Sequence, residues 1–202
     1  MADIIKSRQS DQKQLMTAFN NVVSSINQSN AKRFLSPLTI TLGDEFQGVA
    51  KTVSDALAVI IRLEEEILSR QAGFKLRYVL LEGVIDTPIN SQIAYGMLGE
   101  GLSKARKALQ ESKHGSLRFH IDLLNRSKSQ ALNNSFLVYQ KLLENWNVKK
   151  DYDILMAFLT LHDYKEVAEK LGKTRSQIWK REKSLKINEY IAMKEIIHYI
   201  GK

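Results

Sequence analysis

Acidic side chains at two places in the chain have the residue type and setting that a divalent cation requires. Asp44 follows Gly43 in a turn between two strand-like runs, and Asp3 precedes the apolar pair Ile4 and Ile5. Two carboxylates brought together can hold Mg²⁺, which in turn neutralises the phosphate oxygens of a nucleotide. We therefore expect a magnesium site at Asp3 and Asp44 if their strands lie side by side. The alternative for Gly43 and Asp44 is a simple hairpin turn.

Basic side chains gather in a second segment, residues 164–186, which contains eight Lys and Arg against three Asp and Glu. Gly172 ends a short helix there, because glycine tolerates the left-handed backbone of a tight turn. Thr174 then stands at an N-cap position with Gln177 three residues later, which is the capping-box spacing. A glycine turn followed by a buried aliphatic residue, here Ile178, is typical of a helix-turn-helix motif.

The outer side of the second helix in this segment is expected to contact DNA. The first turn of a recognition helix reaches base edges, while Lys and Arg farther along bind phosphate. The alternative is a plain helical hairpin whose lysines are only solvated. The predicted DNA-binding residues are Lys173, Thr174, Arg175, Ser176, Trp179, Lys180, Arg181 and Lys183.

Composition restricts the classes to which the chain can belong. Its 202 residues suffice for one large domain or two small ones, and an apolar fraction of 44% allows a real core. Cysteine is absent, which excludes disulfides, thiolate catalysis and cysteine zinc sites. No apolar run reaches the roughly 18 residues of a membrane span, and the first residues do not read as a signal peptide. We expect a cytoplasmic protein without membrane contact.

The net charge of +8 is concentrated in the C-terminal part of the chain. Residues 123–202 contain 15 Lys and Arg against 9 Asp and Glu, whereas residues 1–122 contain 15 against 13. A basic end on a near-neutral body is expected of a nucleic-acid-binding module. The charge distribution therefore supports DNA as a partner.

The periodicity of apolar residues predicts an α+β fold in the first part of the chain. Helical spacing predicts helices over residues 10–30, 53–70 and 99–110. Alternation predicts strands over residues 38–42, 46–49, 117–121 and a long one from residue 74 to near Gly83. This order suits a ferredoxin-like or palm-type fold, with helices on one side of a largely antiparallel sheet. Pro37 is expected to break the chain before the first of these strands, and the run Glu64–Glu66 to face solvent.

After Asp122 the pattern changes to helices alone. Polar residues 127–134 suggest a joint, and residues 136–146 a linking helix. The predicted domains are an α+β domain over residues 1–122, a linking helix over 123–148 and a helix-turn-helix domain over 149–202.

Several of these motifs together resemble known families. Asp3 to Arg8 followed by Thr41 to Gly48 resembles the SatD family, and the resemblance runs over essentially the whole chain. Residues 1–122 more distantly resemble the palm domains of class III nucleotide cyclases and GGDEF proteins. In those families one aspartate ends the first strand, another occupies the hairpin, and the two bind metal; Asp3 and Asp44 match these positions. The C-terminal segment resembles the helix-turn-helix of bacterial regulators and of sigma-factor region four.

The cyclase resemblance also implies a nucleotide site. Residues 95–107 are similar to the cyclase stretch that ends in an asparagine and an arginine, which stabilise the transition state. Ser103 stands at the asparagine position and Lys107, or Arg106, at the arginine position, so these three residues are the expected nucleotide contacts. Glu45 stands where cyclases favour a small residue. These departures count against cyclase activity.

The first strand required by this resemblance has little sequence to form it. Only Met1 and Ala2 precede Asp3, whereas a strand usually spans about five residues. We expect a first strand that is missing or very short. Two explanations stay open: a start codon placed too far downstream, or a chain without a working first strand. Either weakens metal binding, because one aspartate loses its fixed position.

The favoured hypothesis is a DNA-binding transcriptional regulator. Its cyclase-like domain would sense a nucleotide or pair with a second copy, as cyclase-like domains commonly do, so a homodimer is expected. A competing hypothesis is a Mg²⁺-dependent nucleotidyl-transfer or cyclase-type enzyme that uses Asp3 and Asp44. A third is a protein-interaction adaptor, and no residue is assigned a catalytic role.

Overall fold

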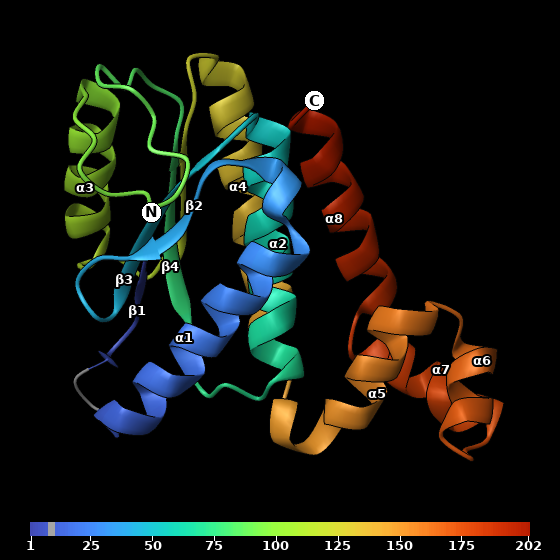
Figure 1. Cartoon of the computed structure of the whole chain (residues 1–202). Coiled ribbons are helices and arrows are strands. Elements are labelled where there is room, and N and C mark those ends of the chain that lie inside the picture. Colours follow the sequence, from blue (N-terminus) through green and yellow to red (C-terminus); the bar gives the residue numbers. More distant parts are fainter. Residues whose placement is uncertain (8–10) are drawn as a thin grey trace. The chain divides into compact units, whose positions relative to one another are not determined.

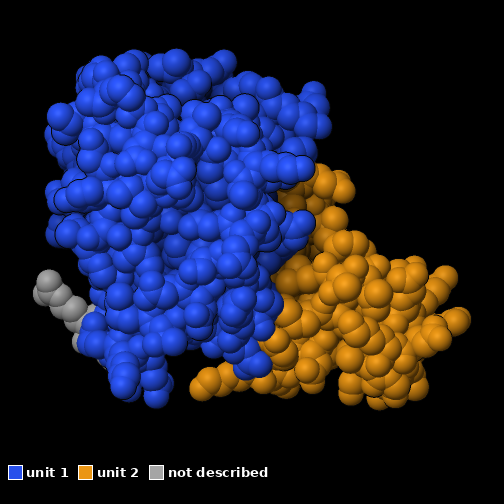
Figure 2. Space-filling model, in the orientation of Figure 1, with its two compact units in different colours: residues 1–136, 197–202 blue, residues 137–196 orange. Residues whose placement is uncertain are grey.

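The computed structural model describes residues 1–7 and 11–202, which form two compact units, shown in different colours in Figure 2. Arg8, which belongs to the SatD resemblance, and Ser10, the expected start of the first helix, lie outside the described residues. The units consist of Met1–Phe136 with Ile197–Lys202, and of Leu137–Ile196.

The boundary between the units falls inside one helix, α4 (Arg126–Glu144). Sequence analysis divides this stretch into a polar joint and a linking helix, but the helix is continuous through both. Residues 123–136 belong to the first unit, and the second unit begins at Leu137.

A five-stranded mixed sheet forms the centre of the first unit, which is an α+β fold (Figure 1). The strand order is β2-β3-β1-β4-β5, and the pairs are antiparallel except for β4 with β5, which is parallel. The strands are β1 (Ala2–Ile4), β2 (Phe34–Ile40), β3 (Glu45–Ala50), β4 (Leu76–Leu81) and β5 (Phe119–Asp122).

Helices cover both faces of this sheet, so the expectation that they lie on one side is wrong. The helices are α1 (Gln12–Ser29), the 3-10 turn η2 (Ala31–Arg33), α2 (Val53–Ser69) and α3 (Glu100–Ser112). Helix α3 lies on one face, and α1 and α2 on the other (Figure 1). The reason lies in β4, which directs apolar side chains to both faces of the sheet. Tyr78 points toward α2, where its hydroxyl bonds Glu64, and Val79 points the other way and packs on Ala105 and Leu109 of α3.

Strand β1 is central but only three residues long, which confirms the expectation of a very short first strand. Ala2 and Ile4 are buried on one face of the sheet. On that face Phe46 of β3 stacks on Phe19 of α1 with ring centroids 5.9 Å apart. Phe19 also meets Phe74 edge-on at 5.8 Å. These rings form the core between the sheet and α1.

Pro37 does not interrupt the chain before the first hairpin strand, because β2 runs through it. Proline lacks an amide donor and is tolerated in strands only at edges and bulges. Strand β2 is the edge of the sheet, and its register with β3 shifts between Ser36 and Thr39, around the proline. The sheet position therefore accommodates a residue that the sequence pattern excludes.

The acidic run of α2 does not face solvent throughout, because Glu64 is buried. Its carboxylate accepts a hydrogen bond from the Tyr78 hydroxyl at 2.8 Å and pairs with the Arg118 guanidinium. Arg118 also donates from Nε to the carbonyl of Leu76 at 2.8 Å. A buried carboxylate requires such partners, and they come from segments distant in sequence.

The second unit is entirely helical. It contains the end of α4 from Leu137 onward and most of α8 (Ile187–Ile200). Between them it contains α5 (Val148–Leu161), α6 (Tyr164–Lys170) and α7 (Arg175–Ser184). Its core is aromatic: Tyr190 stacks on Tyr139 at 5.6 Å and meets Trp146 at 4.8 Å. The Trp146 indole donates to the carbonyl of Leu185 at 2.8 Å, which joins the turn after α4 to the end of α7. None of the described helices combines the length and apolarity needed to span a bilayer.

Candidate functional site

Helix α7 begins behind a complete N-cap. The amide of Gln177 donates to the Thr174 hydroxyl oxygen at 3.3 Å, and the amide of Thr174 donates to Gln177 Oε1 at 3.1 Å. This reciprocal pair is the capping box that the sequence predicts. It fixes the start of the helix at Arg175, where the partial positive charge of a helix N-terminus favours an anion.

The turn before α7 is held by its backbone. Gly172 adopts φ +60°, the left-handed conformation that glycine accepts without strain. The amide of Gly172 donates to Glu169 at 3.2 Å and that of Lys173 to Ala168 at 2.9 Å, which closes the end of α6. Ala168 is buried, and Ile178 is buried as the sequence predicts. The turn therefore sets α7 against α6 in a fixed way.

The outer face of α7 is open to solvent. Trp179 is 47% exposed, which is unusual for so large an apolar side chain, and it lines a shallow hollow with Tyr164, Arg175 and Ser176. Lys180 is exposed one turn further along. The exposed members of the predicted set are Lys173, Thr174, Arg175, Ser176, Trp179, Lys180 and Lys183.

Two of the predicted DNA contacts have acidic partners within the second unit. Arg181 forms an ion pair with the buried carboxylate of Asp151 in α5. Lys183 lies 3.9 Å from Glu182, a long and weak contact. These are the only ion pairs of residues 173–183 within the described part of the chain. Arg181 thus has a structural partner, whereas the cations nearer the helix start do not.

The acidic candidates of the first unit lie on adjacent sheet positions. Asp3 pairs in register with Glu45, and the amide of Ile4 donates to the Asp44 carbonyl at 2.9 Å. The Asp44 carboxylate accepts a hydrogen bond from the Ser7 hydroxyl at 2.5 Å. The backbone therefore brings Asp3 of β1 close to Asp44, which lies in the turn just before β3.

The carboxylate of Asp3 is surrounded by cations. Arg77 in β4 donates from Nη1 to its two oxygens at 3.1 and 3.2 Å, and Lys113 Nζ lies 3.3 Å away. Glu45 stands on the neighbouring strand, β3, and its Oε1 lies 2.8 Å from Nη2 of Arg106 in α3. We call this group the α3 charge cluster; its members are Asp3, Glu45, Arg77, Arg106 and Lys113.

These contacts decide how well the cluster fits Mg²⁺. Magnesium requires several oxygen ligands, and nearby cations oppose it. The Asp3 carboxylate becomes a ligand only if the pairs with Arg77 and Lys113 open. Within residues 1–7 and 11–202, no three His, Asp or Glu side chains gather in a group that could hold a metal ion. The residues in their present pairing do not fit the ion.

The three expected nucleotide contacts on α3 do not all lie on the same side of the helix. Ser103 and Lys107 are exposed, and Lys107 lies 3.8 Å from Glu111 on the same helix. Arg106 instead turns toward the sheet and reaches Glu45. Of the two candidates for the arginine position, Arg106 is therefore the one near Glu45 and its strand partner Asp3.

Sequence analysis misses Arg77, Lys113 and the pairing role of Glu45. The available signal for Arg77 is a basic residue inside a strand that is otherwise apolar. Lys113 lies at the end of α3 and shares no local pattern with Asp3, because only the packing of α3 on the sheet brings them together.

Comparison with known proteins gives one result. A model of the SatD family matches residues 1–199. No curated protein and no solved structure matches the chain.

Proposed function

The chain belongs to the SatD family, and from the geometry of α7 we propose that it is a DNA-binding transcriptional regulator whose α6 and α7 act as a helix-turn-helix. The observation that carries the proposal is the open cationic start of α7. Lys173, Arg175 and Lys180 are exposed and have no ion-pair partner within the described part of the chain. Unpaired cations on a capped helix are suited to phosphate.

The shape of α7 supports direct contact with a groove. Arg175 and Ser176 stand in its first turn, where a recognition helix meets base edges. Trp179 follows one turn later and offers an aromatic surface to a sugar or a thymine methyl group. The acidic side chain of α7, Glu182, is buried away from this face. The face thus presents basic and polar groups without an opposing carboxylate.

Filter binding to a random-sequence DNA duplex of about 30 base pairs, roughly three helical turns, tests the proposal. Affinity should fall linearly with salt on logarithmic axes. The pair Arg175→Ala and Lys180→Ala should lower the slope by about 2 and the affinity by about tenfold or more. The matched control is Lys13→Ala with Lys32→Ala, which removes the same charge from exposed positions of the first unit.

An equal loss of DNA affinity in the two double variants would mean that overall charge drives binding, and the assignment of the DNA contacts to α7 would fail. Binding that is absent, or indifferent to salt, would remove the DNA proposal itself. In that case capture of a protein partner that depends on Trp179 would favour the adaptor.

The α3 charge cluster supports a second role, that of a nucleotide sensor. Arg106 pairs with the Glu45 carboxylate and Lys113 with that of Asp3, and each cation could exchange its carboxylate partner for a phosphate oxygen. Calorimetry with each of the four nucleoside triphosphates, with and without Mg²⁺, tests this role. Heat that requires Mg²⁺ and disappears in Asp44→Asn would favour the enzyme, and heat that needs no metal would favour a sensor. No heat in any titration would remove both.

Pairing of two chains completes the proposed regulator. Two copies would present two α7 helices to half-sites about one helical turn apart. Sedimentation of the full chain measures its mass directly. A monomer at micromolar concentration, with and without DNA, would contradict this arrangement and leave a single-site reader.

A further inference from the structure

The loop that joins β4 to α3 in the first unit, residues 83–99, carries apolar side chains on its outer side. We call it the apolar loop. Among the described residues 14 large apolar side chains are exposed, and five of them lie within residues 84–98. Single exposed apolar side chains are ordinary on a protein surface, but a concentration of them marks an interaction site. The five are Val84, Ile89, Ile93, Tyr95 and Leu98.

The two ends of the apolar loop are bound to each other. The amide of Asp86 donates to the carbonyl of Leu98 at 2.8 Å, and the amide of Gly101 donates to that of Val84 at 3.0 Å. In return the amide of Leu98 donates to the Thr87 hydroxyl oxygen at 2.9 Å. These bonds hold Val84 and Leu98 on adjoining segments, where their exposed fractions are 65% and 71%.

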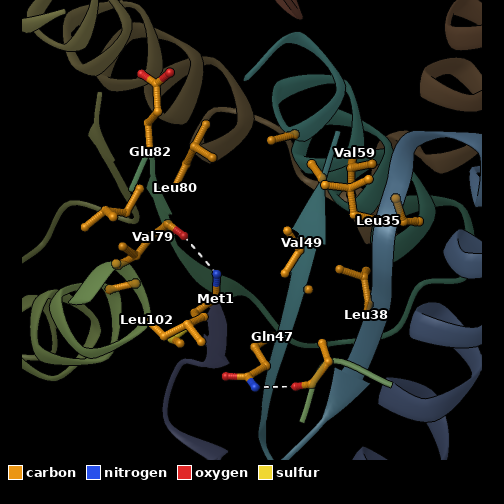
Figure 3. A pocket seen from close by; sticks show the side chains of 18 of the residues that line it. Met1, Leu35, Leu38, Gln47, Val49, Val59, Val79, Leu80, Glu82 and Leu102 are labelled. Atoms are coloured by element: carbon orange, nitrogen blue, oxygen red, sulfur yellow. Dashed lines mark hydrogen bonds between the residues drawn. The ribbon is translucent and has the colours of Figure 1, made fainter. Parts of the chain in front are cut away.

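The middle of the apolar loop is attached to the sheet at the buried residue Ala94. The amide of Ala94 donates to the Thr39 hydroxyl oxygen at 2.8 Å, and its carbonyl accepts a hydrogen bond from the side chain of Gln47, drawn as a dashed line in Figure 3. On either side of this anchor Ile93 and Tyr95 are exposed. The loop is therefore a preformed surface, which loses little conformational freedom on binding.

The charge of this stretch differs from that of the rest of the chain. Residues 78–103 contain no Lys or Arg, although the chain has 30 such residues and a net charge of +8. The acidic residues of the stretch are Glu82, Asp86 and Glu100, and Glu100 Oε1 lies 2.8 Å from Nζ of Lys104. An acidic partner would be attracted to the basic remainder of the surface instead.

A second copy of this chain is the partner that fits such a stretch. It has the same net charge of +8, so the basic surfaces of two copies repel each other. The stretch without cations is where two copies approach with the least repulsion. Identical copies related by a two-fold axis present the same patch to each other, and the central residues of such interfaces are apolar and poor in charge.

We propose that the apolar loop is the surface through which two copies of this chain pair. A stable interface takes about 20–30 residues a side, so the loop forms its centre and adjoining residues form its rim. This inference rests on the pairing of chains in the proposed regulator and gives that pairing a location. It does not depend on α7 or on DNA.

Sedimentation of the full chain over a range of concentrations, with Leu98→Glu as the variant, tests the proposal. Symmetry buries the new carboxylate in both copies at once, so the dissociation constant of the dimer should rise by about a hundredfold or more. The matched control is Leu117→Glu, which places the same charge at another exposed leucine of the first unit and should change the constant by about twofold or less. The Tm of the monomer should stay the same in both variants, because both side chains are exposed.

Hydrogen exchange of the unchanged protein gives a second measurement. Raising the protein concentration should slow exchange within residues 84–98 by about tenfold or more. The exposed segment around Leu117 serves as the reference and should exchange at the same rate at every concentration.

A dimer that the two leucine variants weaken equally, or loop exchange that does not depend on concentration, would overturn the proposal while pairing itself remained. A chain that is monomeric at every concentration would remove the pairing together with its surface. Loss of DNA binding in a chain that still pairs through the loop would remove the proposed DNA function and leave this inference in place.

Discussion

In the first unit the Asp3 carboxylate is held by partners inside the fold, whereas most of the cations singled out on α7 face solvent. Asp3 is 3% exposed and contacts Arg77 and Lys113. Arg175 and Lys180 are exposed at the start of a capped helix. Paired charges of the first kind hold elements together, and unpaired charges of the second kind remain available to a ligand.

Because of this difference, substitutions of the paired charges are expected to change the stability of the fold, and substitutions of the exposed charges to change ligand binding. Changing a buried charge leaves its partner without compensation, which destabilises the fold strongly. Changing an exposed, unpaired charge costs the fold little and affects only what binds there. Both tryptophans, Trp146 and Trp179, belong to the second unit, so their fluorescence reports that unit alone. Unfolding of the first unit is better followed by hydrogen exchange of β4 and β5.

The largest effect is expected at Arg118. Arg118→Ala leaves the carboxylate of Glu64 buried with only the Tyr78 hydroxyl, and should reduce the free energy of unfolding of the first unit by about 3–5 kcal/mol. Hydrogen exchange of β4 in urea measures it. Arg62→Ala removes an exposed partner of Glu65 and should cost about 1 kcal/mol or less. Similar losses in the two variants would contradict the assignment of Arg118.

A smaller loss is expected at Asp3. Asp3→Asn keeps the shape and one acceptor for Arg77 but removes the charge, and should cost about 1–3 kcal/mol. The same exchange measurement reports it. Lys113→Ala is the milder comparison, at about 1 kcal/mol or less, because that side chain is half-exposed. If Asp3→Asn leaves stability unchanged, the α3 charge cluster does not hold the sheet, and a ligand role becomes its remaining explanation.

The cap of α7 should have an intermediate effect in the second unit. Thr174→Ala removes the acceptor for the amide of Gln177 and should cost about 1 kcal/mol. Tryptophan fluorescence in urea follows it. Thr160→Ala is the control, since its hydroxyl only bonds back to Met156 within α5, where alanine is a good helix former. A greater loss at Thr160 would contradict the role of the cap.

The smallest effect on stability is expected for the unpaired cation Lys180. Lys180→Ala should change the free energy of unfolding by less than about 0.5 kcal/mol. Its proposed effect is on DNA, where one lost phosphate contact lowers the salt slope by about 1. Unfolding in urea and filter binding on the same preparation measure both. A large stability loss would show that Lys180 has a structural partner and would remove it from the DNA face.

Local features of both units could be predicted from the sequence. The capping box at Thr174 and Gln177 is confirmed, because capping involves residues three apart on one helix turn. The left-handed Gly172 is confirmed for the same reason, since neighbouring residues decide its conformation. DNA binding, nucleotide binding and dimerisation stay predictions.

The sequence misleads where distant segments meet. Glu64 reads as solvated because its neighbours on α2 are acidic, but Tyr78 and Arg118 approach it from β4 and from the segment before β5. Pro37 reads as a break because proline lacks a donor, but an edge strand does not need one there.

By itself the sequence determined the α+β and all-helical character of the two parts, the capped cationic helix and the basic C-terminal end. All of these depend on periodicity, local hydrogen bonding or composition. Only the tertiary structure decided that α3 covers the second face of the sheet, that Asp3 meets Arg77 and Lys113, and that Glu64 is buried against Tyr78 and Arg118. These depend on contacts between residues far apart in the chain, which burial brings together and local patterns do not encode.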